Sequence, residues 1–335
     1  MSRPDRALAV PDEALMRQAR ARLDSLTKPA GSLGRLEALA VQLVGIMGRL
    51  PPSVAQKVVI TMAADHGVTA EGVSAYPSVV TAQMMRNFHA GGAAINVLAR
   101  QAGARVVVVD LGVGVGTANM ARGPAMPRAA AGRAVEQGME VVAAEMAVGA
   151  DVIGLGEMGI GNTTSASALA AVFTGHPVAA VTGRGTGVDD ATLARKIAVI
   201  ERALAVNRPD SRDPMQALAA IGGYEIAGLV GVILGAAQAR RPVVLDGFIT
   251  GAAALVAAAL EPGVVPSLIA AHCSQEPGHR LLLQHLGLTP LLDLQLRLGE
   301  GTGAALAFHL LEAACRIFTE MATFAEAGVA ERPSC

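Results

Sequence analysis

The sequence contains no tryptophan, and aromatic residues of all kinds make up only 2% of its 335 residues. Charge is also scarce, since Asp, Glu, Lys and Arg together account for 16% and the formal net charge is −1. Proteins that bind nucleic acids commonly carry basic patches and aromatic stacking platforms, so we expect no nucleic-acid partner. Hydrophobic residues make up 52% of the chain, which predicts a core packed mostly by Ala, Val, Leu and Ile.

Cysteine and long apolar runs are rare as well. The three cysteines, Cys273, Cys315 and Cys335, are far apart, which argues against a disulfide framework. The longest apolar stretches, 226–239 and 248–260, fall short of the roughly 18 residues that a membrane-spanning helix needs. The charged segment 1–22 does not resemble a secretory signal. We therefore predict a cytoplasmic protein that does not enter a membrane.

Six short runs rich in Val and Ile recur through the middle of the chain, and Ala- and Leu-rich stretches of helical length separate several of them. The runs span 57–65, 105–112, 151–157, 177–183, 242–247 and 265–271. Continuous apolar runs of this length indicate strands that are buried on both faces. Alternation with helices is typical of βαβ units. We predict an α/β fold of Rossmann-like type, with a parallel six-stranded sheet and helices on both faces.

The two ends of the chain differ from this middle part. Residues 1–50 have a helical and charged pattern, and residues 302–325 carry apolar residues at helical spacing. The segment 291–298 alternates in the manner of a strand. We predict an α/β domain over 51–290 and a small helical domain built from 1–50 together with 291–335.

Polar residues and glycines follow the six apolar runs. The polar residues at or just beyond the ends of the runs include Asp65, Asp110, Glu157, Arg184, Asp246 and His272. Turns in α/β proteins favour Gly and Asp in any case, but Glu157 and Arg184 are not favoured turn residues. Because ligands of open parallel sheets bind beyond the carboxyl ends of the strands, we expect the site at this edge.

Two of these ends carry glycine-rich loops, GEMGIGNTTSASAL (156–169) and TGRGTGVDD (182–190). Free backbone N–H groups and hydroxyls in such loops suit a phosphate, although ordinary helix caps would give a similar pattern. The first loop lacks the lysine of a P-loop. Arg184 in the second loop is a candidate partner for a phosphate or carboxylate, or a solvated turn residue.

Three further motifs are candidates for ligand binding. DLGVGVG (110–116) has the wrong glycine spacing for a dinucleotide site, and HCSQEPGH (272–279) has too few ligand pairs for zinc, so we expect no metal. Asp65 and His66 either form an acid–base pair or have only a structural role. The segment VSAYPSVVTAQMM (73–85) lines a pocket for a flat ring, or is an ordinary loop before a helix.

One glutamate near the C-terminus stands out. Glu300 lies between Gly299 and Gly301 in LRLGEGTGAALAFHLLEAA (296–314), directly before a helical pattern. A glutamate in the first turn complements the helix dipole, which is one interpretation. The other is a catalytic base held at the entrance of a helix.

Taken together, these motifs resemble the nicotinate-nucleotide–dimethylbenzimidazole phosphoribosyltransferase family. The matching stretches run in order along the chain: 27–37, 64–68, 73–84, 89–99, 156–169, 182–187, 246–255, 272–279, 296–305 and 321–329. The resemblance implies transfer of the 5-phosphoribosyl group of nicotinate mononucleotide to 5,6-dimethylbenzimidazole, giving α-ribazole 5′-phosphate and nicotinate. It also implies a homodimer and no cofactor.

The resemblance further implies roles for individual residues. Glu300 matches the family's catalytic base, and Glu157 is expected to support it at the reacting centre. The benzimidazole is expected to contact Ser74, Tyr76, Pro77 and Gln83. The phosphoribosyl and nicotinate groups are expected to contact Gly159, Gly161, Asn162, Thr163, Thr182, Gly183, Arg184, Gly185, Thr186, Lys196 and Ser274. Two alternatives stay open: phosphoribosyl transfer to another azole, purine or phenolic acceptor, and nucleotide binding without catalysis.

Overall fold

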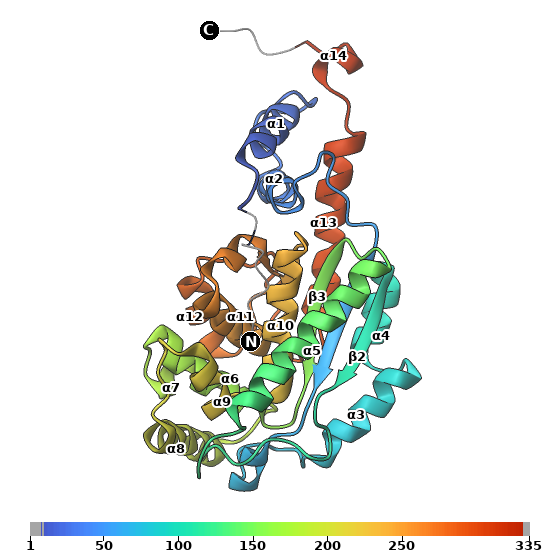
Figure 1. Ribbon diagram of the computed structural model, residues 1–335. Coiled ribbons are helices and arrows are strands. Elements are labelled where there is room, and N and C mark those ends of the chain that lie inside the picture. Colours follow the sequence, from blue (N-terminus) through green and yellow to red (C-terminus); the bar gives the residue numbers. More distant parts are fainter. Residues whose placement is uncertain (1–7, 9, 331–335) are drawn as a thin grey trace.

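The centre of the fold is an all-parallel sheet, seen in a computed structural model that describes residue 8 and residues 10–330. Within this range the sheet has five strands in the order β2-β1-β3-β4-β5 (Figure 1). They are β1 (Lys57–Ala63), β2 (Ala104–Asp110), β3 (Val152–Met158), β4 (Val243–Leu245) and β5 (Leu268–Ala270). Five of the six predicted strand segments are therefore confirmed. Cys335 and the start of the predicted helical domain lie outside the described residues.

The prediction of a sixth strand over 177–183 is wrong. Residues Val178–Val181 form a short helix, α7, that begins after Pro177. The φ angle of Pro177 is −55°, and proline is well suited to the start of a helix. The apolar part of this run is so short that periodicity cannot separate a strand from a buried helical turn. The segment 291–298 is irregular apart from one isolated bridge between His272 and Leu292.

Helices pack on both faces of the sheet. Alternate residues of β1 enter two separate cores: Val58 and Ile60 face one side, and Val59 faces the other. The first core includes α5 (Arg128–Ala147), α10 (Tyr224–Gln238) and α11 (Phe248–Leu260). The second core includes α2 (Arg35–Met47), α4 (Ala94–Ala102) and α13 (Thr302–Glu320). Complete burial of β1 on both faces explains its continuous apolar sequence.

Small residues permit very close packing between α5 and α10. A Cβ atom on Gly138 would lie 2.0 Å from the carbonyl oxygen of Gly228, and one on Gly231 would lie 1.9 Å from that of Val135. Both contacts are shorter than any real Cβ contact, so the two backbones meet where side chains would collide. This packing is how a chain with few aromatic residues fills its core.

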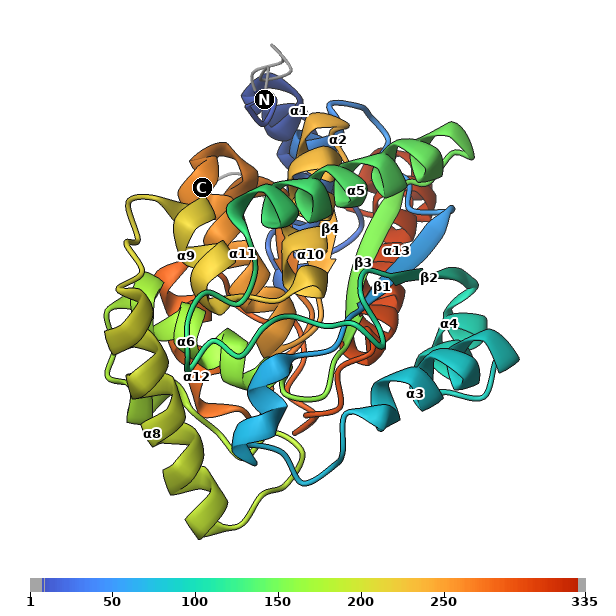
Figure 2. The same cartoon turned by 60° about the horizontal axis from the view of Figure 1, so that its bottom comes forward.

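The remaining helices complete the layers and connect the strands (Figures 1 and 2). They are α1 (Glu13–Asp24), η1 (Gly67–Glu71), α3 (Val79–Ala90), α6 (Asn162–Thr174), α8 (Asp190–Asn207), α9 (Pro214–Ile221), η2 (Pro262–Ser267), α12 (Pro277–His285) and α14 (Phe324–Ala327). The carboxyl ends of the strands point toward the bottom of Figure 1, and Figure 2 turns that side toward the viewer.

Helices from the first and last parts of the chain pack together toward the top of Figure 1, where α2 contacts both α1 and α13. Leu26 forms an isolated antiparallel bridge with Thr323, and the Arg22 guanidinium donates to the carbonyl oxygen of Met321 at 3.1 Å. Division of the chain into two domains stays a prediction.

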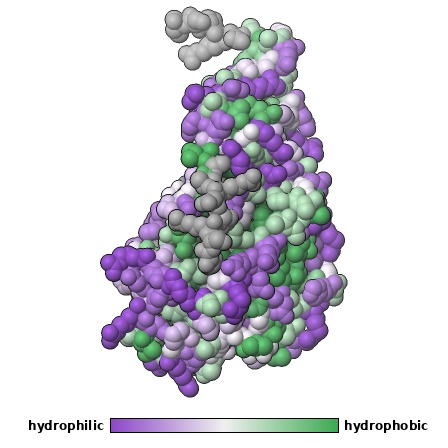
Figure 3. Space-filling view, viewed as in Figure 1, coloured by the Kyte–Doolittle hydropathy of each residue, from purple (hydrophilic) through white to green (hydrophobic). Residues whose placement is uncertain are grey.

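In the face shown in Figure 3, hydrophobic residues form separate groups among polar ones. No helix in the described part of the chain is long and apolar enough to cross a membrane.

Candidate active site

A cavity of about 400 Å³ lies at the carboxyl ends of the strands. Its wall includes the end of β3, the start of α6, the segments after β4 and β5, and the residues before α13. Predicted site residues in the wall are Tyr76, Glu157, Gly159, Asn162, Thr163, Gly185, Thr186, Ser274 and Glu300. Those outside the wall are Ser74, Pro77, Gln83, Gly161, Thr182, Gly183, Arg184 and Lys196.

The backbone of Glu300 adopts a left-handed conformation with φ 64°, which is rare for a residue other than glycine. Such a conformation costs about 1–3 kcal/mol and persists only where neighbouring groups enforce it. The Thr61 hydroxyl of β1 donates to the carbonyl oxygen of Glu300 at 3.0 Å. A Cβ on Gly156 of β3 would lie 2.2 Å from the same oxygen. Glu300 is therefore pressed directly against the ends of two strands.

The carboxylate of Glu300 lies at the N-terminus of α4, where its Oε2 accepts a hydrogen bond from the backbone N–H of Ile95 at 3.2 Å. Burial raises the pKa of Glu300, and the nearby Asp246 charge adds to this rise, while the Ile95 hydrogen bond opposes it. A carboxylate with a raised pKa is a better proton acceptor near neutral pH.

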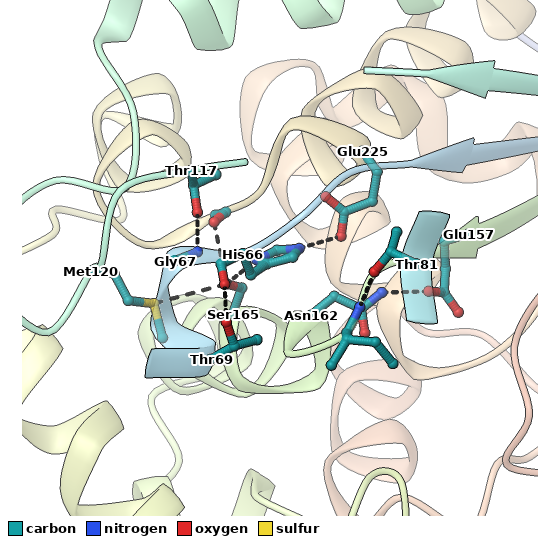
Figure 4. A network of polar contacts seen from close by, with 12 residues as sticks. His66, Gly67, Thr69, Thr81, Thr117, Met120, Glu157, Asn162, Ser165 and Glu225 are labelled. Atoms are coloured by element: carbon teal, nitrogen blue, oxygen red, sulfur yellow. Dashed lines mark hydrogen bonds and ion pairs between the residues drawn. The ribbon is translucent and has the colours of Figure 1, made fainter. Parts of the chain in front are cut away.

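Glu157, at the end of β3, is the second buried carboxyl group of the wall. It accepts a short hydrogen bond from the Asn162 side chain (Figure 4). The pKa of Glu157 is raised to about 8, chiefly by burial. The charges of Glu225, Asp246 and Glu300 contribute to this rise, and the Asn162 hydrogen bond opposes it. A Cβ on Gly299 would lie 2.2 Å from Glu157 Oε1. The glycine before Glu300 is thus required by the close approach of Glu157.

A buried lysine lies behind the wall on another side of the cavity. Lys196 of α8 donates from Nζ to Thr163 Oγ1 at 2.7 Å and to the Gly183 carbonyl oxygen at 3.3 Å. Burial lowers the pKa of Lys196 to about 8, and the Glu276 carboxylate opposes this shift. Glu276 accepts a hydrogen bond from the backbone N–H of Gly185 at 2.8 Å. The two predicted glycine-rich loops therefore meet at Lys196.

Two predicted contacts in the second loop serve local structure. The Thr182 hydroxyl donates to the Val178 carbonyl oxygen at 2.7 Å. The Arg184 guanidinium, which is half exposed, pairs with Asp190 and donates to the Val188 carbonyl oxygen at 2.8 Å. Arg184 therefore holds the turn before α8.

The segment predicted to contact a flat ring lies at the rim. Thr186 Oγ1 lies 3.3 Å from the Ser74 hydroxyl and accepts a hydrogen bond from the Ala75 N–H at 3.2 Å. Tyr76 lines the cavity while its side chain is 54% exposed. From α3, Val80 and Met84 enter the wall, whereas Gln83 is exposed to solvent.

Behind the carboxylates lies a buried polar network (Figure 4). His66 Nε2 is 2.7 Å from Glu225 Oε1, and His66 Nδ1 is 3.2 Å from the Ser165 hydroxyl. Asp65, its neighbour in sequence, accepts from the Gly114 N–H at 2.7 Å instead. The partner of His66 is thus a glutamate 159 residues away, and Asp65 serves a separate loop. The described residues contain no cluster of three or more His, Cys, Asp or Glu side chains suited to a metal ion.

Comparisons with known proteins agree on one family. A family model described as a phosphoribosyltransferase matches residues 8–329. A nicotinate-nucleotide–dimethylbenzimidazole phosphoribosyltransferase of Desulforudis audaxviator is 57% identical, over 96% of this chain and 95% of that protein. One of Roseiflexus sp. is 58% identical, over 95% of this chain and 94% of that protein. The chain belongs to the nicotinate-nucleotide–dimethylbenzimidazole phosphoribosyltransferase family. It is also similar to the crystal structure of CobT from Thermus thermophilus, at TM-score 0.91 and 48% identity, covering 95% of this chain and 100% of that one.

Some residues of the cavity are not among the predicted site residues. Glu276 and His272 line the wall, and Asp246 lies directly behind it. Although burial lowers the pKa of His272, the neighbouring Asp246 carboxylate raises it, and the net shift is upward. The positions of Asp246 and His272 after predicted strands were a usable signal. Glu276 and Arg297 lie within the quoted motifs 272–279 and 296–314, but in irregular segments where no pattern distinguishes them from their neighbours.

Proposed function

We propose that the protein transfers the 5-phosphoribosyl group of nicotinate mononucleotide to 5,6-dimethylbenzimidazole, giving α-ribazole 5′-phosphate and nicotinate for the nucleotide loop of cobalamin. The observation that carries this proposal is a single cavity that has Glu300 in its wall and Lys196 behind Thr163. The Glu300 carboxylate can accept a proton, and the Lys196 ammonium group can bind a phosphate. Membership of the family supports nicotinate mononucleotide and 5,6-dimethylbenzimidazole as the substrates of these groups.

The reaction breaks one C1′–N bond and forms another. The ring nitrogen of nicotinate mononucleotide is already cationic, so nicotinate leaves with the bonding electron pair and needs no proton. One nitrogen of the benzimidazole attacks C1′ from the opposite face, which converts the β configuration to α. The proton on its other nitrogen becomes acidic and passes to Glu300, whose raised pKa favours acceptance.

Glu157 has a different part in this proposal. A pKa of about 8 keeps it mainly protonated at neutral pH. A protonated Glu157 adds no negative charge beside Glu300 and leaves Glu300 as the ionised partner of the developing cation. We assign Glu157 to support of the reacting centre and Glu300 to proton transfer.

Lys196 and the two loops make up the phosphate side. The Lys196 ammonium group, the Thr163 hydroxyl and the Gly185 backbone lie together there. Gly159 and Ser274 line the same cavity. Charge-assisted hydrogen bonds from an ammonium group and loop N–H donors are typical phosphate ligands. Gly161, Asn162 and Gly183 then serve by shaping these loops.

The acceptor side lies toward Tyr76, Val80 and Met84, where apolar side chains suit a flat ring. Ser74, Pro77 and Gln83 belong to the same segment at the rim. Tyr76 and Leu298 line the cavity although they are 54% and 58% exposed, which supports a second subunit over the mouth. We therefore propose a homodimer, and location in the cytoplasm remains a prediction from the sequence.

The test is an HPLC–mass spectrometry assay of purified protein with nicotinate mononucleotide and 5,6-dimethylbenzimidazole. Wild type should form α-ribazole 5′-phosphate, and Glu300→Gln should lower turnover by roughly 10²-fold, the usual scale for general-base catalysis. Parallel assays with purine, azole and phenolic acceptors would show which acceptor the enzyme uses. Absence of product with every acceptor, despite tight nucleotide binding, would contradict the proposed activity.

A further inference from the structure

Asp246 lies between the sheet and α13, the helix whose N-cap directly follows Glu300. It follows β4, its side chain is 1% exposed, and it points at the N-terminus of α13. The cavity wall contains its neighbours Gly247 and His272, while the Asp246 carboxylate sits directly behind them. The proposed reaction gives this carboxylate no chemical step.

The Asp246 carboxylate accepts hydrogen bonds from three backbone N–H groups of the first turn of α13. Gly301 donates to Oδ2 at 3.2 Å, and Gly303 and Ala304 donate to Oδ1 at 2.6 Å and 3.3 Å. These N–H groups are ones that a helix cannot satisfy by itself. A side chain from another element therefore caps α13, where its own N-cap residue, Gly301, has no side chain to do so.

Glu300 is the residue directly before this cap. Its left-handed backbone is held from three directions: Thr61 binds its carbonyl oxygen, Gly156 packs against that oxygen, and Asp246 binds the next N–H group. These contacts come from β1, β3 and the end of β4, which are neighbours in the sheet. A rare backbone conformation persists when such contacts over-determine it.

The space around Asp246 leaves little freedom for this arrangement to move. A Cβ on Gly303 would lie 2.1 Å from His272 Cδ2 and 2.8 Å from Asp246 Oδ1. The imidazole of His272 also lies next to the carboxylate, with its Nε2 3.6 Å from Asp246 Oδ1. The glycine at position 303 therefore allows helix, carboxylate and imidazole to meet in one place.

We propose that Asp246 is a positioning residue that sets the backbone of Glu300, and thereby the direction of the Glu300 carboxylate, through the first turn of α13. This inference rests on the proposed function only for the role of Glu300 as proton acceptor. The positioning of Glu300 by Asp246 does not depend on that role and can be tested separately.

The structural test uses hydrogen–deuterium exchange of the intact protein, read by mass spectrometry. Asp246→Asn keeps the side-chain shape but places an amide NH2 group against a backbone N–H donor. Exchange should accelerate in peptides that cover 299–304. Asp213→Asn is the matched control, because Asp213 caps α9 by accepting from the Gln216 N–H at 3.1 Å. Unchanged exchange at 299–304 in Asp246→Asn would overturn the proposal, even if the protein had no transferase activity.

The catalytic test is a double-mutant cycle with Glu300→Gln. Asp246→Asn should lower kcat by about 10- to 100-fold, the scale of a misplaced catalytic group, with little change in the KM for nicotinate mononucleotide. If Asp246 acts through Glu300, adding Asp246→Asn to Glu300→Gln should lower kcat by less than about threefold further, because groups acting as a unit are not additive. A full additional loss in the double variant would overturn the positioning role. If Glu300→Gln alone had the same kcat as the active wild type, Glu300 would not be the catalytic base.

Discussion

The two sides of the cavity hold buried charge in opposite ways. On the carboxylate side, burial raises the pKa of Glu157 to about 8, and the surrounding acidic side chains push it in the same direction. On the lysine side, burial lowers the pKa of Lys196, and the Glu276 carboxylate limits this fall, so that the pKa is about 8. Charges of like sign gather at one side, and charges of opposite sign oppose desolvation at the other.

These opposite surroundings give the two sides different charge states: the carboxylate side takes up protons, and the Lys196 ammonium group stays charged. Desolvation and like charges both disfavour the ionised carboxylate, so protons bind to the acidic side near neutral pH. At the lysine side a countercharge preserves the ammonium group that a phosphate needs. A bound phosphate would add further negative charge near Lys196 and strengthen that preference.

The largest expected effect concerns stability on the carboxylate side. The unfolded chain releases the Glu157 proton near pH 4.5, whereas the folded protein holds it up to about pH 8. The unfolded state therefore binds fewer protons in this window, and the free energy of unfolding falls as pH rises. Between pH 5 and pH 8 the loss should be on the order of 3 kcal/mol. Glu157→Gln should remove this dependence, as measured by urea unfolding at several pH values.

Glu136→Gln is the control for this prediction, because Glu136 is exposed on α5 and the same substitution there should leave the slope unchanged. Parallel pH profiles for wild type and Glu157→Gln would show that Glu157 ionises normally in the folded protein. The two sides of the cavity would then not differ in the way described.

The next effect concerns the lysine side and is read from catalysis. Lys196→Met removes the ammonium group and keeps the length of the side chain. We expect kcat/KM for nicotinate mononucleotide to fall about 10- to 100-fold, since a hydrogen bond to a charged group contributes about 1.5–3 kcal/mol. The KM for the acceptor base should change little.

Lys57→Met provides a matched control, because Lys57 is also a buried lysine but pairs with Glu312 at 2.9 Å at the amino end of β1. That variant should retain the wild-type KM for nicotinate mononucleotide. Equal losses in both variants would mean that Lys196 contributes to folding and not to phosphate binding.

How far the sequence predicts this fold depends on the length and the composition of each apolar run. The continuous Val- and Ile-rich runs of β1, β2 and β3 identify buried parallel strands correctly. The run at 177–183 contains two alanines and no isoleucine between Pro177 and Thr182, and α7 forms there. Alanine favours helices and is depleted in strands. The run of β4, Val243–Leu245, is not longer but has no alanine, and it does form a strand. Packing against neighbouring helices decides such a short segment, and packing is not visible in local periodicity.

The cavity is predictable where a motif ends a strand and less so where distant loops meet. Glu157 and the glycines around Glu300 follow directly from patterns in the chain. Glu276 enters the site because its loop folds back onto Gly185, 91 residues earlier. Gln83, predicted to contact the benzimidazole, is exposed on α3, and this contact stays a prediction.

The smallest expected effect tests the countercharge on the lysine side. Glu276→Gln retains an oxygen for the Gly185 N–H but removes the negative charge that raises the pKa of Lys196. In wild type, the KM for nicotinate mononucleotide should rise as pH passes about 8, because Lys196 loses its proton there. In Glu276→Gln this rise should begin at a lower pH, by less than about one unit, while KM at pH 6.5 stays the same. The substrate phosphate is largely ionised above about pH 7, so the shift reports on the protein. A profile that stays in place, or moves to higher pH, would mean that Glu276 shapes the loop without influencing the charge of Lys196.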